Sequence, residues 1–248
     1  MEESLVQNLL LSSLPIATYS CLQPHLESCA LKRGFVIELP GQPVRYAHFF
    51  DEGFASILIR VQERSAEVGL IGREGMLGLP AVLGAEVSDY RAVIVANARV
   101  RRIPIEVLRK EMQTERALWA IMLRFIQAGV TQIAHTSFAN SQLTISQRLA
   151  RWLLMAHDRV DSDTVKVTHA TLSEALGVQR SGTTLALHEL EREGGIRSLP
   201  RAVEIIDRTT LAEKTMGSYG PAERAYRQLL GSEASKSART REVKLARS

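Results

Sequence analysis

The chain has 248 residues, of which 45% are hydrophobic and 23% are charged, as is usual for a globular protein of one or two domains. No apolar run is long enough to span a bilayer, so we expect a cytoplasmic protein with no membrane partner. The net charge of +4 arises in the last 28 residues, which carry 7 basic and 3 acidic residues, so it is no evidence of a basic binding surface.

The first 34 residues predict a helical segment. Leucines recur at helical spacing in Met1–Leu11, and a second short helix is expected at Leu22–Leu31, before Gly34. Cys21 and Cys29 are the only cysteines of the chain, and in a reducing compartment we expect them to be free thiols. A single disulfide between them, or a redox role, is the alternative.

Residues 35–113 change from a helical period to short strand-like runs. Turn residues separate these runs at near-regular spacing, which is typical of a small antiparallel barrel or jelly roll, here called the β-roll. Asp51–Gly53 is typical of a hairpin turn. The expected strands are Phe35–Leu39, Tyr46–Phe50, Phe54–Val61, Ala66–Ile71, Arg91–Ala96 and Arg99–Ile103.

Residues 114–140 have the pattern of one long helix with two apolar stripes. One stripe alternates spacings of three and four, as coiled-coil seams do. It consists of Trp119, Met122, Ile126, Gly129, Ile133 and Thr136. The other stripe, expected to pack on the β-roll, consists of Leu118, Ile121, Phe125 and Ala128. Two apolar faces predict a dimerisation helix, whose interface would contain Met122, Ile126, Gly129 and Ile133; the alternative is a core helix buried in a monomer.

Residues 141–210 predict a winged helix-turn-helix. Leu143–His157 has the pattern of an amphipathic helix, with Arg148 and Arg151 expected on its outer side. Thr168 is suited to cap a second helix that ends at Gly177, and a third helix and a hairpin with arginines at its tip follow. Two short helices joined by a glycine turn are typical of this motif, although an αα-hairpin in any helical domain has the same pattern.

Four motifs carry a family resemblance: LGVQR at the turn, LHELEREGGI across the third helix, EIID after the hairpin and ISQRLARWLLMAHDRV in the first helix. They resemble the Crp/Fnr family of bacterial transcription regulators. The resemblance implies an α+β protein with a cyclic-nucleotide-binding-like β-roll, a long dimerisation helix and a C-terminal winged helix-turn-helix. Its parts would be an N-terminal helical segment (1–34), the β-roll sensor domain (35–113), the dimerisation helix (114–140), the DNA-binding domain (141–210) and a partly disordered C-terminal extension (211–248).

The resemblance also implies a homodimer that binds double-stranded DNA and contacts RNA polymerase. On the third helix, the side chains expected to face bases or phosphates are Gln179, Arg180, Ser181, Thr184 and His188. Arg180 is the best candidate for guanine, which arginine binds through two hydrogen bonds. The residues assigned to backbone phosphates are Thr168, Arg197 and Arg201. Gly182 lies in the first turn of the third helix, where an alanine would cost about 1 kcal/mol less, and Gly195 stands where the family usually has a core leucine. Both glycines predict a loosely packed DNA-reading head.

A small-molecule site is implied in the β-roll. Gly75, Gly78 and Arg91 fall where relatives that bind cyclic AMP hold its phosphate, but Leu79 stands where a ribose-binding glutamate is expected. Leucine cannot accept a hydrogen bond from ribose, so we do not expect a cyclic nucleotide. The alternative for Arg91 is a salt bridge or solvent exposure. A different small-molecule effector in the same cavity stays open.

No other cofactor or enzyme activity is expected. Some members of the family hold an iron–sulfur cluster through four cysteines, and two cannot do so. No metal site is expected, and the sequence has no nucleoside-triphosphatase loop, GxSxG, HExxH or CxxC motif. We therefore expect a sequence-specific DNA-binding transcription regulator. Two alternatives stay open. One is a ligand-independent DNA-binding dimer whose β-roll is only a scaffold or a docking surface for RNA polymerase. The other is a sensor module that works through protein contacts, with a degenerate helix-turn-helix and no effector.

Overall fold

The computed structural model describes residues 6–62 and 64–228, and its N-terminal part is less helical than expected. Two short helices, α1 (Leu9–Ser12) and α2 (Ile16–Leu22), lead through the 3₁₀ turn η1 (Gln23–His25) into the strand β1 (Glu27–Leu31). The helix predicted at Leu22–Leu31 is therefore wrong, because β1 pairs along its whole length with the strand β6 (Arg91–Pro104). The helix predicted at Met1–Leu11 lies partly outside the described residues, and within them it begins only at Leu9.

The β-roll is antiparallel, as predicted. Its further strands are β2 (Val36–Glu38), β3 (Tyr46–Val61), β4 (Arg64–Ile71), β5 (Met76–Leu77) and β6 (Arg91–Pro104). The six-stranded sheet has the order β1-β6-β3-β4, with β2 paired to β6 and β5 paired to β3.

The hairpin turn predicted at Asp51–Gly53 is wrong, because β3 runs through it as one strand with irregular register against β6. Asp51 is buried and accepts hydrogen bonds from the backbone N–H groups of Gln7 and Asn8 and from Arg101 Nε at 2.8 Å. Gly53 has φ 72° and lies so close to the backbone of Asn97 that an added Cβ would overlap it. These turn-forming residues therefore serve a bulge inside the sheet. The two runs predicted at Arg91–Ala96 and Arg99–Ile103 likewise form one strand, β6.

Two helices not predicted from the sequence complete this part of the chain. The short α3 (Leu79–Val82) follows β5, and α4 (Ile105–Thr114) follows β6. In α4 the buried residues Ile105, Leu108 and Met112 recur at helical spacing, behind Pro104 at the N-cap. The run is short and directly continues a strand, which hides its period in the sequence.

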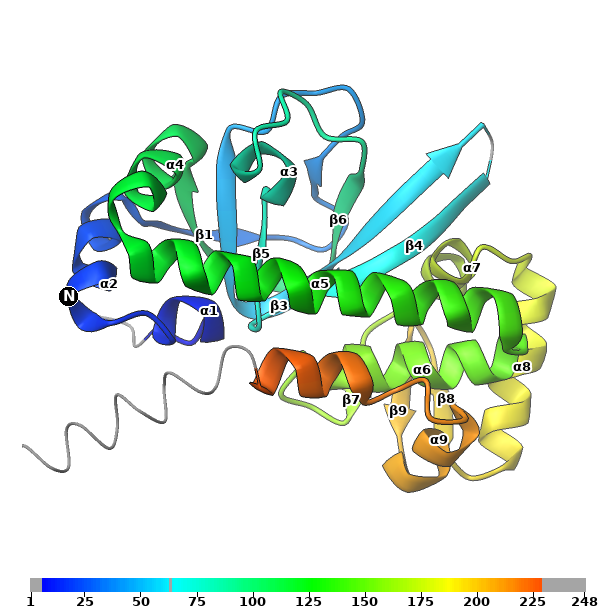
Figure 1. Cartoon of the computed structure of the whole chain (residues 1–248). Helices are drawn as coiled ribbons and strands as arrows, with labels where there is room; N and C mark the ends of the chain where they lie inside the picture. Colours follow the sequence, from blue (N-terminus) through cyan, green and yellow to red (C-terminus); the bar gives the residue numbers. More distant parts are fainter. Residues whose placement is uncertain (1–5, 63, 229–248) are drawn as a thin grey trace, which may run out of the picture.

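The long helix α5 (Arg116–Gln142) runs along the β-roll and joins it to the C-terminal domain (Figure 1). Its predicted inner stripe is confirmed, since Leu118, Ile121, Phe125 and Ala128 are all buried. By length and apolar composition alone α5 could cross a membrane, but it packs on the sheet and buries a polar side chain, Gln132, as a core helix does.

The C-terminal domain is a winged helix-turn-helix. Its helices are α6 (Ile145–His157), α7 (His169–Leu176), α8 (Arg180–Arg192) and α9 (Arg208–Lys214). The strands β7 (Thr164–Val165), β8 (Ile196–Leu199) and β9 (Ala202–Ile205) form a three-stranded sheet of order β7-β9-β8. Thr144 begins α6 with a capping box that includes Gln147. Leu211 of α9 is fully buried in the same core as α6 and α8.

A further helix, residues 221–228, returns from the C-terminal domain to the underside of α5 (Figure 1). Tyr226 is buried against Phe125, with ring centroids 6.2 Å apart. The C-terminal extension expected at 211–248 therefore contains a helix within the described residues. The rest of this extension, with most of its basic residues, lies outside the described residues.

The C-terminal domain docks on the β-roll through a buried interface that is partly polar. Trp152 of α6 packs edge-on against Phe54 and donates its indole N–H to Glu67 Oε2 at 3.0 Å. Glu67 also accepts from Ser56 Oγ at 2.6 Å. Beside it, the buried Arg159 donates to Glu74. These contacts hold α6 on the strand β4 and on the turn that follows it.

Glu67 should make stability depend on pH. Burial raises its pKa to about 7, although hydrogen bonds from Ser56 and Trp152 oppose this shift. The unfolded pKa is about 4.3, so folding binds a proton at intermediate pH. The free energy of unfolding should therefore fall as pH rises from about 4 to 7, and level off above that range.

The variant Glu67→Gln keeps both hydrogen-bond acceptor roles and removes the titration. We expect it to lose this part of the pH slope and to gain up to about 4 kcal/mol over the wild type at pH 8. Urea unfolding at pH 5, 6, 7 and 8 would measure this, with the exposed Glu86→Gln as control. The expectation fails if Glu67→Gln and Glu86→Gln have the same slope.

Candidate functional site

The helix pair α7–α8 is held by caps and by hydrogen bonds between its two helices. Thr168 caps α7 by accepting from the Thr171 N–H at 3.1 Å, and Gly177 ends it with φ 63°. The buried hydroxyls of Ser173 and Thr183 lie 2.9 Å apart and join the two helices. The helix-turn-helix predicted here is therefore present, with α8 as its second helix.

The outer face of α8 carries most of the side chains predicted to contact DNA. Gln179, Arg180, Ser181 and His188 are exposed. Thr184 is half-buried, and its hydroxyl donates to the Arg180 carbonyl at 3.0 Å and lies 3.2 Å from His169 Nδ1. Thr184 is therefore less free to turn toward a ligand than the other four.

The wing, β8 and β9 with their connecting turn, carries the two predicted phosphate-binding arginines. Arg197 is exposed and pairs with Glu204 at 3.0 Å. Arg201 is exposed at the turn, with φ 61°. Sequence reasoning missed Arg33 of the β-roll, whose pKa is lowered by burial and, second, by the nearby charge of Arg201. Arg33, two positions after β1, is therefore near enough to Arg201 for the two charges to interact, and the sequence gives no signal of this long-range proximity.

Arg148 and Arg151 were expected on the outer side of α6, and this expectation is wrong. Arg151 is buried and donates its Nε to the Ser218 carbonyl at 3.2 Å. The guanidinium of Arg148 donates to the carbonyl of Leu176 at the end of α7. Both side chains are therefore occupied in holding neighbouring segments to α6.

The glycines of the DNA-reading head mark close packing rather than looseness. An added Cβ at Gly182 would lie 3.1 Å from Ile145 Cδ1, so this glycine lets α6 approach α8. At Gly195 an added Cβ would lie 2.9 Å from Leu211 Cδ2, and Leu211 fills that space. The expectation of a loosely packed head is wrong, because side chains from α6 and α9 occupy the vacated volume.

A cavity of about 400 Å³ lies between the β-roll and α5. Its lining is mostly aliphatic and includes Leu79, which follows Gly78 in the wall. Glu38 also lines it, but both of its carboxylate oxygens are engaged at 2.8 Å, by the Gly78 N–H and by Ser88 Oγ. Burial raises the pKa of this carboxyl. Tyr226, from beyond the helix-turn-helix, forms another part of the wall.

The residues predicted to hold a ligand phosphate do not meet in this cavity. Gly78 lines it, with φ 101°. Gly75 instead packs directly under the ring of Phe125. Arg91 points to α7 and pairs with Glu174 at 3.0 Å, which is the salt-bridge alternative. No lysine, arginine or histidine is among the described residues that line the cavity.

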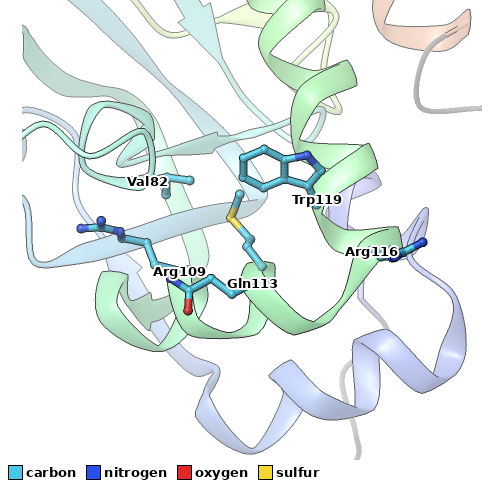
Figure 2. Close-up of a pocket in the computed structure, with 6 residues that line it drawn as sticks. Val82, Arg109, Gln113, Arg116 and Trp119 are labelled. Atoms are coloured by element: carbon cyan, nitrogen blue, oxygen red, sulfur yellow. The ribbon is translucent and has the colours of Figure 1, made fainter.

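A second hollow of about 400 Å³ lies where α4 meets the start of α5. It is lined by Val82, Arg109, Met112, Gln113, Arg116 and Trp119 (Figure 2). Figure 2 shows Arg109 and Arg116 pointing to opposite sides, so the two guanidinium groups do not converge on one anion.

The exposed apolar stripe of α5 is rotated from the predicted one. Met122 is fully buried in the β-roll core, and Gly129 is half-buried beside the cavity. The stripe that faces outward, called here the α5 seam, keeps the coiled-coil spacing and consists of Trp119, Leu123, Ile126, Val130 and Ile133. Ile126 and Ile133 of the predicted interface therefore stay on the seam, and Leu123 and Val130 replace Met122 and Gly129.

Two further expectations concern the cysteines and the side chains that could bind a metal ion. Cys21 is exposed and Cys29 half-buried, and both are free thiols, as expected. In residues 6–62 and 64–228, no three or more His, Cys, Asp or Glu side chains are grouped to hold a metal ion.

Comparison with known proteins agrees with this architecture. Residues 147–214 match the family model of a Crp-like helix-turn-helix domain. The chain is 28% identical over 194 residues to the transcriptional regulator SdrP of Thermus thermophilus. The aligned region covers 75% of this chain and 93% of SdrP.

Two solved structures share the fold. One is a putative Crp/Fnr-family regulator from Eubacterium rectale, with TM-score 0.67, 17% identity, and 84% of this chain and 97% of that chain covered. The other is the c-di-GMP-responsive global regulator CLP of Xanthomonas campestris, with TM-score 0.62, 17% identity, and 78% and 100% covered. These two structures show the fold, and the family model shows a Crp-like helix-turn-helix, both as the sequence motifs predicted.

Proposed function

We propose that this chain, which has the fold of Crp/Fnr regulators and a Crp-like helix-turn-helix, regulates transcription by binding DNA sequence-specifically as a cytoplasmic homodimer. The observation that carries this proposal is the outer face of α8, where Gln179, Arg180, Ser181 and His188 are exposed on a well-packed domain. Such a helix fits the major groove, with the wing beside the phosphate backbone. The tight packing around Gly182 and Gly195 disfavours the alternative of a degenerate helix-turn-helix.

Dimerisation would use the α5 seam. Trp119, Val130 and Ile133 are 47–54% exposed in a single chain, an unfavourable state for large apolar side chains at coiled-coil spacing. Pairing two such helices would bury them and present two copies of α8 to a palindromic site, about 34 Å apart. RNA polymerase is the further partner that a regulator of this kind would contact.

The β-roll cavity supports an effector other than a cyclic nucleotide. A phosphate buried in it would meet no cation, because Arg91 is paired with Glu174 outside. An unpaired buried charge is costly. The aliphatic lining instead suits a neutral, mostly apolar small molecule.

Two arginines should affect DNA binding differently. Arg180→Ala should reduce the preference for the operator over a scrambled duplex by about 10- to 100-fold, because it removes a base contact. Arg201→Ala should weaken binding to both duplexes alike. It should also reduce the salt dependence of the binding constant by the amount that one phosphate contact contributes. Fluorescence anisotropy with a selected operator at several salt concentrations would measure both, with the exposed Lys110→Ala of α4 as control. Equal losses of preference from both arginine variants would contradict this assignment.

The variant Val130→Asp should separate the dimer. It would place a carboxylate at the centre of the α5 seam in each protomer, and burying unpaired charges costs several kcal/mol. We expect the dimer dissociation constant to rise at least about 100-fold, measured by analytical ultracentrifugation. Val61→Asp, at a valine 67% exposed on β3, is the matched control. A Val130→Asp protein that stays dimeric would exclude the seam as the interface.

The cavity should discriminate by charge. We expect no calorimetric binding of cyclic AMP at millimolar concentration, but enhanced fluorescence of the uncharged probe N-phenyl-1-naphthylamine. Gly129→Leu, which adds a side chain to the cavity wall, should abolish the probe signal. Micromolar binding of cyclic AMP would refute this part of the proposal.

A further inference from the structure

Leu185 is the one large apolar side chain on the outer face of α8, and it is 71% exposed. The buried face of this helix consists of Thr183, Ala186, Leu187 and Leu190. Leu185 instead follows Ser181 by four positions and precedes His188 by three, so the three side chains share the outer face. Nothing in the packing of the domain requires an apolar side chain there.

The surroundings of Leu185 are polar. Arg180, Ser181 and His188 are exposed around it, and Thr184 is held by His169. A single leucine among groups that form hydrogen bonds is too small a patch to dock a protein. It lies among the side chains that the proposed function assigns to base edges and phosphates.

The major groove offers one apolar group at its base edges, the C5-methyl of thymine. Hydrogen-bonding side chains recognise the donors and acceptors of the base edges, whereas an aliphatic side chain can make a favourable contact only with that methyl group. We propose that Leu185 specifies a thymine in each half-site through contact with its methyl group. This inference rests on the proposed function, namely that α8 enters the major groove.

Deoxyuridine provides the test because it differs from thymidine only by the methyl group. An operator would first be selected from random duplexes with the full-length protein. Each thymine of one half-site would then be replaced in turn by deoxyuridine. We expect one position at which replacement weakens binding about threefold to fourfold, and about tenfold when both half-sites are changed, as burial of one methyl predicts.

The variant Leu185→Ala should bind the thymine and deoxyuridine duplexes equally well. Leucine and alanine are both good helix formers, and the side chain is exposed, so the melting temperature should stay unchanged. Val61→Ala, at the exposed valine of β3, should keep the wild-type response to deoxyuridine.

The outcomes separate this inference from the proposed function. Operator binding with one methyl-dependent position that Leu185→Ala abolishes supports the inference. Operator binding that no deoxyuridine changes, or a methyl effect that persists in Leu185→Ala, overturns the inference and leaves the proposed function intact. Failure to select any duplex overturns both.

Discussion

The buried contact between α6 and the β-roll fixes the orientation of the helix-turn-helix. Trp152 inserts among Phe54 and Glu67, and Arg159 reaches Glu74 and the carbonyl of Leu70. A buried polar interface tolerates few arrangements, because every displaced donor or acceptor would lose its partner away from water. The helix-turn-helix domain is therefore held in one defined position rather than tethered by a flexible linker.

The helix α5 links this interface to the cavity. Its Gln132 accepts from the Leu70 N–H at 2.7 Å, on the strand that also carries Glu67. The same helix lines the cavity with Gly129 and with three residues of the seam, Ile126, Val130 and Ile133, so the seam borders the cavity. Effector, partner subunit and DNA-reading head would thus act on one rigid element, which is the physical basis for coupling them.

Local signals in the sequence predicted the C-terminal domain well. The cap at Thr168, the glycine at Gly177 and the apolar spacing of α8 all act within one or two turns of chain, and the structure has each of them. Long-range constraints were not predictable in this way. Gly53 lies in a bulge where the backbone of Asn97 comes too close for a side chain. Arg91 does not line the cavity and instead pairs with Glu174, which is distant in the sequence. Likewise, the sequence of α5 is compatible with two neighbouring apolar seams. Only packing on the β-roll determines that Met122 lies on the inner side of the helix and not on the exposed seam.

The place of Tyr226 in the cavity wall has a consequence for biosynthesis. Most of the wall comes from the β-roll and α5, which leave the ribosome first, whereas Tyr226 follows the whole helix-turn-helix. The cavity therefore closes only after the DNA-reading head has been synthesised. A nascent chain without this last segment would have a sensor domain with an open wall, so an effector could bind its complete site only in a protein already equipped to respond.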